Sequence, residues 1–177
     1  PDQVRIIPSA VGGGFGGKLD CSVQPLLAVA AWILEKPIRC TFTRPESLAS
    51  STKRHPAKMK ASASCKKDGT LTSLSFEGDF NTGAYASWGP TVADRVPIHC
   101  SGPYFIPNIL AKTRALLTNG PPSGAFRGFG VPQSAIAHEA LMDSLAEQTR
   151  IDPLEVRLKN ALRKGHRTGS GQLLENS

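Results

Sequence analysis

Long apolar runs and metal-binding cysteine pairs are both missing from the 177-residue sequence. No stretch reaches the roughly 18–20 apolar residues that span a bilayer, and we expect no signal peptide. The 4 cysteines form no Cys-x-x-Cys pair, which argues against zinc or an iron–sulfur cluster held by this chain alone. These absences predict a cytoplasmic protein with reduced cysteines and no membrane segment. Because the sequence starts at Pro1 rather than Met, we expect it to be part of a longer protein.

Acidic and aromatic residues are scarce. Asp and Glu number 14 against 21 Lys and Arg, which gives a formal net charge of +7, and only 6% of the residues are aromatic. The densest basic segment, between Lys53 and Lys67, has no interleaved aromatic residues that could stack on bases. We therefore expect a solvated basic face, or a face for an acidic partner or phosphate group, and no nucleic-acid partner. A nucleic-acid-binding domain is an alternative that rests on net charge alone.

Period-two alternation predicts a long β-hairpin. The pattern runs over Ala57–Lys67, turns at Asp68-Gly69, and returns over Thr70–Asn81. The longest apolar run, Pro25–Leu34, fits a buried helix that begins near Ser22–Gln24, because a proline is tolerated only in the first turn of a helix. Further strands are predicted at residues 4–8, 37–44 and 110–119, and further helices at residues 44–52, 134–150 and 152–164.

These elements indicate an α+β fold with a mixed sheet, a long β-hairpin and packed helices. Asp152 is expected to cap the last helix, with Pro153 at its first position. We expect one partial domain over residues 1–165, followed by a loosely structured tail at residues 166–177.

The first glycine-rich loop resembles a dinucleotide-binding sequence. Five of the six residues 12–17 are glycine, and Gly12, Gly14 and Gly17 match the pattern Gly-x-Gly-x-x-Gly. In that motif the helix opens within the loop, which would put Pro25 deep inside the helix at a cost of about 3 kcal/mol. The second predicted strand also ends at Arg44 rather than at the acidic residue that binds a ribose. Both features argue against a dinucleotide.

Two other interpretations of this loop remain. Gly12, Gly17 and Lys18 match most of the phosphate-binding pattern Gly-x-x-x-x-Gly-Lys-[Ser/Thr]. Leu19, however, stands where a hydroxyl must bind magnesium, and leucine has no oxygen to offer. A bend without a ligand is the third interpretation, but each glycine costs roughly 0.5–1 kcal/mol relative to alanine, which a mere bend does not explain.

A second glycine-rich loop, Gly120–Gln133, again alternates glycine with phenylalanine and adds Arg127. Bare backbone amides, a guanidinium group and flat apolar side chains suit an anionic ligand that contains a ring. Because a predicted helix follows each loop, the two loops could close on one ligand from two sides.

The loop sequences GGGFGGK and AFRGFGVPQ are similar to the paired cofactor loops of the molybdenum hydroxylases, the xanthine dehydrogenase and aldehyde oxidase family. The segments KRHPAKMKASASCKKDGTL, YFIPNI and DPLEVRLKN resemble the same family in the same order. The similarity extends from Val4 to about Gly165. It implies that the chain is part of the large molybdopterin-binding domain of such an enzyme.

The resemblance also implies roles for single residues. In both loops, backbone and side-chain groups would contact the cofactor. This set comprises Gly14, Phe15, Gly16, Ala125, Phe126, Arg127 and Gly128. Phe129 would form one face of the slot for an aromatic substrate, and Arg95 matches a substrate-orienting arginine of purine-oxidising members.

Leu19 departs from the family pattern within the same substrate region. Xanthine dehydrogenases have a glutamate directly after GGK that helps to hold the purine, and leucine can neither accept nor donate a proton. The substrate is therefore expected to be a less polar aldehyde or N-heterocycle. Asp20, one residue further on, is expected to point elsewhere.

The family's chemistry implies an oxidoreductase that hydroxylates its substrate with water as the oxygen source. Molybdopterin, in its plain or cytosine dinucleotide form, would carry the redox step, and electrons would pass to [2Fe-2S] clusters and FAD on other domains or subunits.

The glutamate general base of the family lies in a more C-terminal motif that no stretch here matches. We therefore expect no catalytic residue and no direct metal ligand in this chain. Glu139, Glu147 and Glu155 are assigned to helix surfaces or helix pairs. The isolated chain is expected to be inactive and the parent protein dimeric, with a non-catalytic binding module of the same fold as the alternative.

Overall fold

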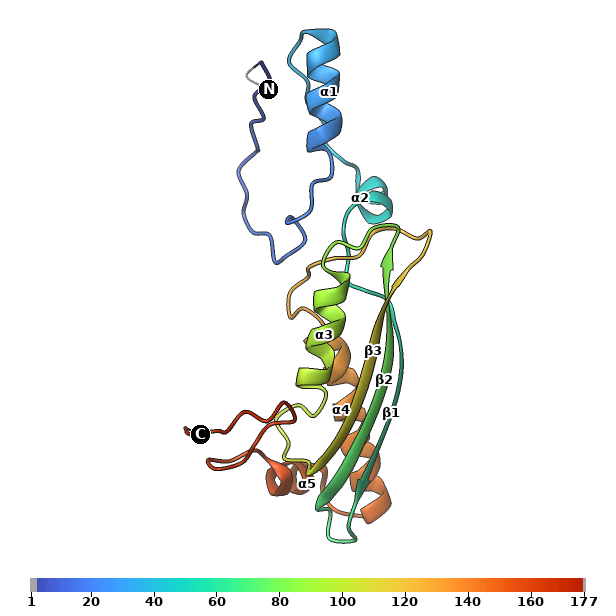
Figure 1. Cartoon of the computed structure of the whole chain (residues 1–177), viewed down its shortest axis with the longest axis vertical. Coiled ribbons are helices and arrows are strands. Elements are labelled where there is room, and N and C mark those ends of the chain that lie inside the picture. The colour runs from blue at the N-terminus through green and yellow to red at the C-terminus, as the bar shows by residue number, and fades with distance from the viewer. Residues whose placement is uncertain (1–2, 177) are drawn as a thin grey trace.

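A three-stranded sheet with helices on one face forms the centre of the structure, a computed structural model that describes residues 3–176 (Figure 1). The strands lie in the order β1-β2-β3, with β1 antiparallel and β3 parallel to β2. In chain order the elements are α1 (Gln24–Leu34), α2 (Arg44–Ser50), β1 (Ala57–Cys65), β2 (Leu71–Gly83), α3 (Gly89–His99), β3 (Asn108–Leu117), α4 (Val131–Thr149) and α5 (Pro153–Asn160). This mixed sheet with packed helices confirms the predicted α+β class.

The β-hairpin of β1 and β2 is confirmed together with its turn. Gly69 adopts φ +80°, which a residue with a side chain rarely does, and its N–H donates to the Lys66 carbonyl at 2.9 Å. The Asp68 carboxylate accepts from the backbone N–H of Thr70 at 3.1 Å. Local turn chemistry therefore sets the register of the hairpin, and β2 continues to Gly83 rather than ending at Asn81.

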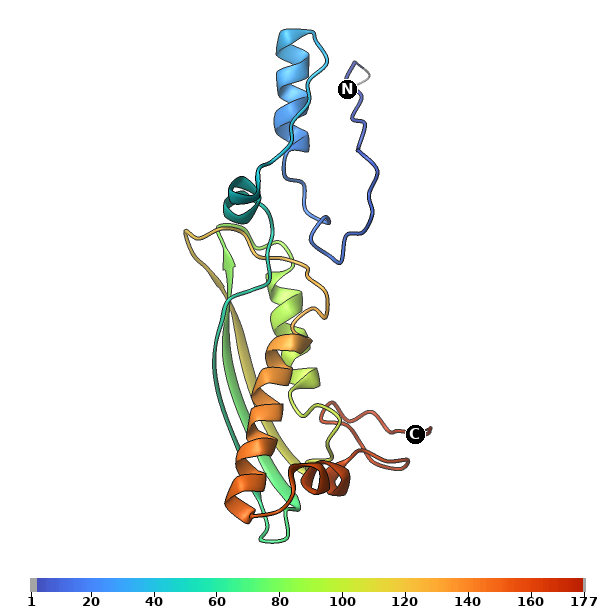
Figure 2. The same ribbon diagram turned by 180° about the vertical axis from the view of Figure 1, so that it is seen from behind.

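The core lies between the sheet and helices α3 and α4, which cover the same face (Figures 1 and 2). Phe76 and Phe80 of β2, Val96 of α3 and Met142 of α4 are at most 1% exposed. Helix α3 also makes the crossover that a parallel β2–β3 pair requires. The sequence pattern does not predict α3, because a segment punctuated by glycine and proline, including Pro97, is typical of a loop.

The predicted strands at residues 4–8 and 37–44 are wrong. Both segments are extended, but neither pairs with another strand among residues 3–176. A β-strand exists only through the ladder it makes with a neighbour, so a suitable composition alone does not create one.

Helix α1 begins near the predicted position, but the prediction that it is buried is wrong for this chain. None of its residues is buried, and Leu26 and Trp32 are 72% and 65% exposed. The helix projects from the end of the molecule remote from α5 (Figure 1), so no other described element covers its apolar side chains. None of the helices within residues 3–176 is both long and apolar enough to cross a membrane.

Helix α4 starts earlier than its predicted first residue, Ser134. It begins at Val131, because Gly130 at φ +95° provides the N-cap and Pro132 fits the first turn. The second loop therefore ends at Gly130.

Helix α5 is capped as predicted and is fixed to the hairpin. Asp152 accepts hydrogen bonds from the N–H groups of Leu154 and Glu155, and Pro153 occupies the first turn. The buried Asn160 side chain accepts from Leu71 N–H at 2.9 Å and donates to the carbonyls of Gly69 and Val156 at 2.8 Å each.

The segment after α5 contains no helix and only isolated bridges in the part of the chain that the structure describes. Arg167 pairs with Leu173, and Tyr104 pairs with Ala161.

Polar side chains join α4 to α5. The Glu139 carboxylate accepts from Tyr104 Oη at 2.8 Å and from Arg157 Nε at 2.9 Å. Burial and this bond to a carboxylate raise the pKa of Tyr104 to about 12. Beside them the imidazole of His138 is buried, which lowers its pKa although the Glu139 carboxylate opposes the shift.

Replacement of Asn160 by Ala is expected to lower the free energy of unfolding of the full-length protein by about 2–3 kcal/mol, because it leaves the buried Leu71 N–H and Gly69 carbonyl without partners. Chemical denaturation measures the change. The control is Asn108→Ala, whose exposed amide makes one bond to the Thr72 carbonyl and should change stability by less than about 1 kcal/mol. Equal effects of the two substitutions would contradict this role of Asn160.

Acidification is expected to destabilise the fold through His138. Its pKa is lowered in the folded state, so the unfolded chain takes up the proton first as the pH falls below about 6.5. Stability from this group is therefore complete above that pH and is lost as the pH falls towards the folded-state pKa. Thermal unfolding between about pH 7.5 and 5.5 should show a smaller slope in His138→Gln than in the His99→Gln control. An unchanged slope in His138→Gln would refute this.

Candidate cofactor and substrate site

The two glycine-rich loops are in backbone contact. A Cβ atom on Gly16 would lie 2.9 Å from both the carbonyl carbon and oxygen of Ala125 and 3.0 Å from the nitrogen of Phe126. Gly16 also adopts φ +89°, and a Cβ on Gly17 would touch the Phe126 ring at 3.7 Å. The first loop (residues 12–19) can therefore approach the second loop (residues 120–130) this closely only with glycine at position 16.

Both loops are built from short turns that contain strained residues. In the first loop the N–H of Gly17 donates to the Gly14 carbonyl at 2.9 Å, and in the second the N–H of Phe129 donates to the Phe126 carbonyl at 2.7 Å. Phe15 and Phe129 both have left-handed φ values, +51° and +50°. Such residues cost on the order of 1–3 kcal/mol each and gather at ligand sites, which marks these two loops as candidates.

Guanidinium groups lie over the phenylalanine rings of both loops. Arg127 lies over Phe15 with 5.8 Å between its Cζ atom and the ring centroid. Arg95 of α3 lies over Phe129 at 5.8 Å, and Trp88 meets the same ring edge-on, with 5.9 Å between the centroids. The structure thus brings together two predicted cofactor residues, Arg127 and Phe15. It also brings together the two predicted substrate residues Arg95 and Phe129. Leu19, which ends the first loop, is 61% exposed.

Arg54 is a site residue that the sequence interpretation missed. It lies over Phe126 at 4.8 Å and donates from Nη2 to the Arg127 carbonyl at 2.7 Å. The predicted solvated basic face is therefore wrong for two of its members, since Arg54 is half-buried and His55 is buried. Burial also lowers the pKa of His55. In the sequence, Arg54 and His55 differ from the exposed lysines that follow only in standing directly before Pro56 and strand β1. The sequence alone does not reveal that these two side chains are partly or fully buried.

Asp20 fixes the end of the first loop through hydrogen bonds to two hydroxyl groups. Its carboxylate accepts from Ser87 Oγ at 2.8 Å and from Thr52 Oγ1 at 3.1 Å. A Cβ on Gly124 of the second loop would lie 2.6 Å from the same carboxylate. Asp20 therefore joins the first loop to the turn before α3 and to the second loop.

Several hydrogen-bond donors at this contact have no acceptor within residues 3–176. They are the backbone N–H groups of Phe15, Gly16, Arg127 and Gly128 and the buried Nη1 of Arg54. Of these donors, Arg54 Nη1 is buried, and a buried donor without a partner is unfavourable unless a ligand or water satisfies it. Phe15, Arg127 and Gly128 are exposed residues, so their N–H groups are accessible to a ligand or to solvent. Amide and guanidinium donors between flat rings fit an oxygen-rich, anionic ring compound such as molybdopterin. Among the described residues, no three His, Cys, Asp or Glu side chains gather as metal ligands.

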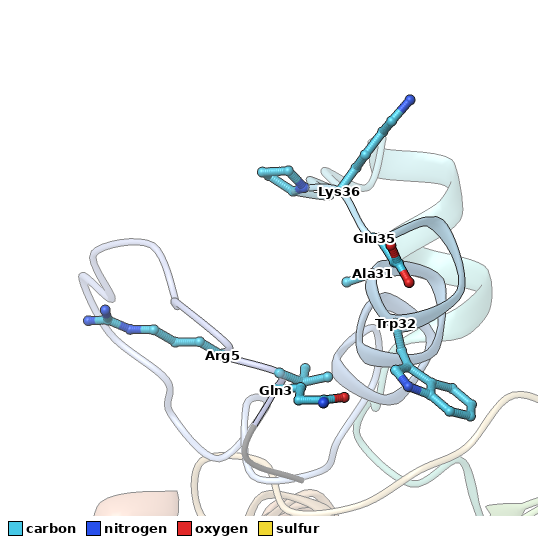
Figure 3. Close-up of a pocket in the computed structure, with 8 residues that line it drawn as sticks. Gln3, Arg5, Ala31, Trp32, Glu35 and Lys36 are labelled. Carbon is cyan, nitrogen blue, oxygen red and sulfur yellow. The ribbon is translucent and has the colours of Figure 1, made fainter.

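A separate cavity of about 540 Å³ lies between residues 3–5 and α1. Figure 3 shows Gln3 and Arg5 on one wall and Trp32 and Glu35 on the other. None of the loop residues above lines it, so it is not part of the candidate site.

The fold places two glycine-rich turns in contact at one end of the packed sheet and helices. The chain belongs to the molybdopterin cofactor-binding domain family, whose profile matches residues 1–161. This confirms the predicted molybdenum hydroxylase family.

Among its relatives, the chain is 46% identical over 175 residues to the nicotinate dehydrogenase large molybdopterin subunit of Eubacterium barkeri, covering 99% of this chain and 41% of that protein. It is 35% identical over 166 residues to the xanthine dehydrogenase molybdenum-binding subunit of Escherichia coli, covering 92% of this chain and 22% of that protein. The structure of the aldehyde oxidoreductase from Desulfovibrio gigas superposes with a TM-score of 0.86 at 38% identity, covering 92% of this chain and 18% of that chain. The chain thus spans less than half of each of these relatives, all of which are oxidoreductases by name.

Replacement of Asp20 by Ala is expected to loosen the first loop, because it removes the acceptor for Ser87 and Thr52. Amide hydrogen exchange over residues 12–19 should accelerate by about tenfold, which corresponds to the loss of roughly one to two hydrogen bonds. The control is Asp94→Ala, an exposed carboxylate on α3. If both variants exchange like the parent protein, Asp20 does not hold the loop.

Proposed function

We propose that the protein containing this chain is a molybdenum hydroxylase that oxidises an aldehyde or an N-heterocycle with water as the oxygen source. The observation that carries the proposal is the contact between Gly16 and Ala125, which brings unsatisfied N–H donors from both loops to one place. A turn with no ligand would gain nothing from two strained phenylalanines and five glycines at such a contact.

The proposed cofactor contacts come from both loops. Gly14, Phe15 and Gly16 present backbone groups from the first loop, and Ala125, Phe126, Arg127 and Gly128 present theirs from the second. Arg127, placed over Phe15, adds a positive charge for an anionic group. When bound, molybdopterin would supply the redox chemistry, while these residues hold and orient it.

The proposed substrate lies against Phe129, between Trp88 and Arg95. The relatives named above are called dehydrogenases or oxidoreductases of nicotinate, xanthine and aldehyde, which supports a ring compound or an aldehyde. Leu19 stands where the resemblance implies a glutamate in purine-oxidising members, so we expect a substrate less polar than a purine.

The remaining machinery is proposed to lie outside this chain. Residues 1–165 would form part of the molybdopterin domain, with residues 166–177 as a tail, and the rest of that domain would cover the exposed apolar residues of α1. The catalytic glutamate, the [2Fe-2S] clusters and FAD would belong to other segments or subunits of a cytoplasmic, dimeric enzyme. The cofactor would be molybdopterin or its cytosine dinucleotide, and the isolated chain would be inactive. Substrate-dependent dye reduction by the isolated chain would contradict that last point.

Replacement of Gly16 by Ala in the full-length protein is expected to abolish cofactor retention, because the new Cβ would collide with the Ala125 carbonyl and require a strained φ of +89°. Molybdenum analysis and pterin fluorescence of the purified protein measure the loss, which should exceed about tenfold. The matched control is Gly12→Ala, since a Cβ there would meet nothing within 4 Å.

Full molybdenum content in Gly16→Ala would show that the loop contact does not hold the cofactor. A parent protein that never contains molybdenum or pterin would favour the alternative, a non-catalytic binding module of the same fold.

A further inference from the structure

The second loop reverses direction at residues 126–129, and the peptide between Arg127 and Gly128 lies at the centre of that turn. The N–H of Phe129 closes the turn by donating to the Phe126 carbonyl at 2.7 Å. Gly128 has φ +88°, whereas Arg127 has no positive φ. This combination of backbone angles is that of a type II β-turn.

The turn by itself does not fix the orientation of its central peptide. Type I and type II turns differ by a rotation of that peptide of about 180°, which reverses the directions of its C=O and N–H groups. The closing hydrogen bond from Phe129 to Phe126 is common to both types. Gly128 accepts either sign of φ, the observed +88° or the value of about −90° of a type I turn. Selection of one orientation therefore depends on a contact from outside the turn.

Arg54 makes such a contact. Its Nη2 donates to the Arg127 carbonyl at 2.7 Å, and its guanidinium lies over the Phe126 ring with 4.8 Å between Cζ and the ring centroid. No backbone N–H within residues 3–176 donates to the same carbonyl. In the flipped orientation this carbonyl would point away from the guanidinium, and a charge-assisted hydrogen bond would be lost.

The residues on either side of Arg54 hold its backbone beside the loop. Before the turn, the Lys53 carbonyl accepts from the N–H of Gly124 at 3.1 Å. After the turn, the His55 carbonyl accepts from Nε2 of Gln133 at 3.2 Å. The guanidinium therefore reaches the turn from a backbone that is fixed to both ends of the loop.

The orientation of the central peptide decides which group the loop presents to a ligand. None of the peptide bonds within residues 3–176 is cis, and in a trans peptide the C=O and N–H groups point in opposite directions. With the Arg127 carbonyl held by Arg54, the N–H of Gly128 points away from Arg54. Gly128 is exposed, and its N–H has no acceptor within residues 3–176. A flip would replace this donor by a carbonyl oxygen, which cannot donate to an anion.

We propose that Arg54 is a positioning residue, whose hydrogen bond to the Arg127 carbonyl holds the Arg127–Gly128 peptide in the orientation that presents the Gly128 N–H to the cofactor. This inference rests on the proposed function, in which Gly128 contacts the cofactor. Arg54 acts through the backbone of the turn and needs no contact of its own with the ligand.

The test uses Arg54→Met in the full-length protein, which removes the donor and keeps an apolar side chain beside Phe126. Release of pterin from the purified holoprotein, followed by fluorescence, should be about tenfold faster, as expected for the loss of one hydrogen bond to an anion. Arg54→Lys keeps a cationic donor and should stay within about threefold of the parent rate. The matched control is Arg114→Met, which removes an exposed arginine that donates to Asp79 at 2.7 Å and should leave the rate unchanged.

Crystal structures of the same variants give a second measurement that does not depend on the cofactor. In Arg54→Met the peptide should flip, with φ of Gly128 near about −90°, whereas Arg54→Lys should keep a positive φ. A role in fold stability alone would lower the melting temperature and leave this peptide as it is. If Arg54→Met cannot be purified, Arg54→Gln replaces it, because the shorter side chain does not reach the Arg127 carbonyl.

An unflipped peptide in Arg54→Met would overturn the proposal, and so would a flipped peptide with parent-like pterin release. If the parent holoprotein oxidises its substrate while either result is obtained, this inference fails and the proposed function stands. If the parent protein contains neither molybdenum nor pterin, the proposed function fails. A flip in Arg54→Met would then still support Arg54 as the residue that orients the Gly128 N–H, and its absence would refute that role.

Discussion

The contact between Gly16 and the Ala125 carbonyl is the constraint on which the rest of the candidate site depends. No side chain fits between the two backbones, so the loops can meet only where position 16 has no Cβ. Their meeting places Phe15 beneath Arg127 and leaves backbone N–H donors of both loops without internal acceptors. A site formed in this way offers hydrogen bonds from fixed backbone groups, which need little reorganisation when a ligand binds.

The scaffold holds the two loops by different means. The second loop is short and anchored at both ends, because β3 precedes it and α4 begins directly after Gly130. No helix or strand lies within residues 3–11, directly before the first loop, and the carboxylate of Asp20 joins this loop to Ser87 and Thr52. The first loop is therefore connected to the core through polar contacts, whereas the second loop directly links strand β3 to helix α4 of the packed core.

Arginine and phenylalanine form three cation–π pairs at the site, and each side chain of a pair stabilises the other. A partly exposed ring is stabilised by a cation over its face, and a guanidinium beside a ring is held in a defined plane without losing its donors. Two of the three pairs use the rings at the ends of one short turn, Phe126–Phe129, and the third joins Arg127 of that turn to Phe15. Arg54 belongs to this arrangement although 73 residues separate it from Arg127, and no local pattern in the sequence indicates that proximity.

The sequence by itself determined the features that depend on neighbouring residues: the hairpin turn at Asp68-Gly69, the Asp152 cap of α5 and the glycine–phenylalanine composition of both loops. Their physical causes, a residue's preferred φ and hydrogen bonds over a few positions, are encoded locally. Only the tertiary structure decided that residues 4–8 and 37–44 do not form strands, that Arg54 turns inward, and that Gly16 meets Ala125. Each of these features depends on whether a residue far along the chain packs against the segment or pairs with it. No single stretch of the sequence determines such long-range contacts.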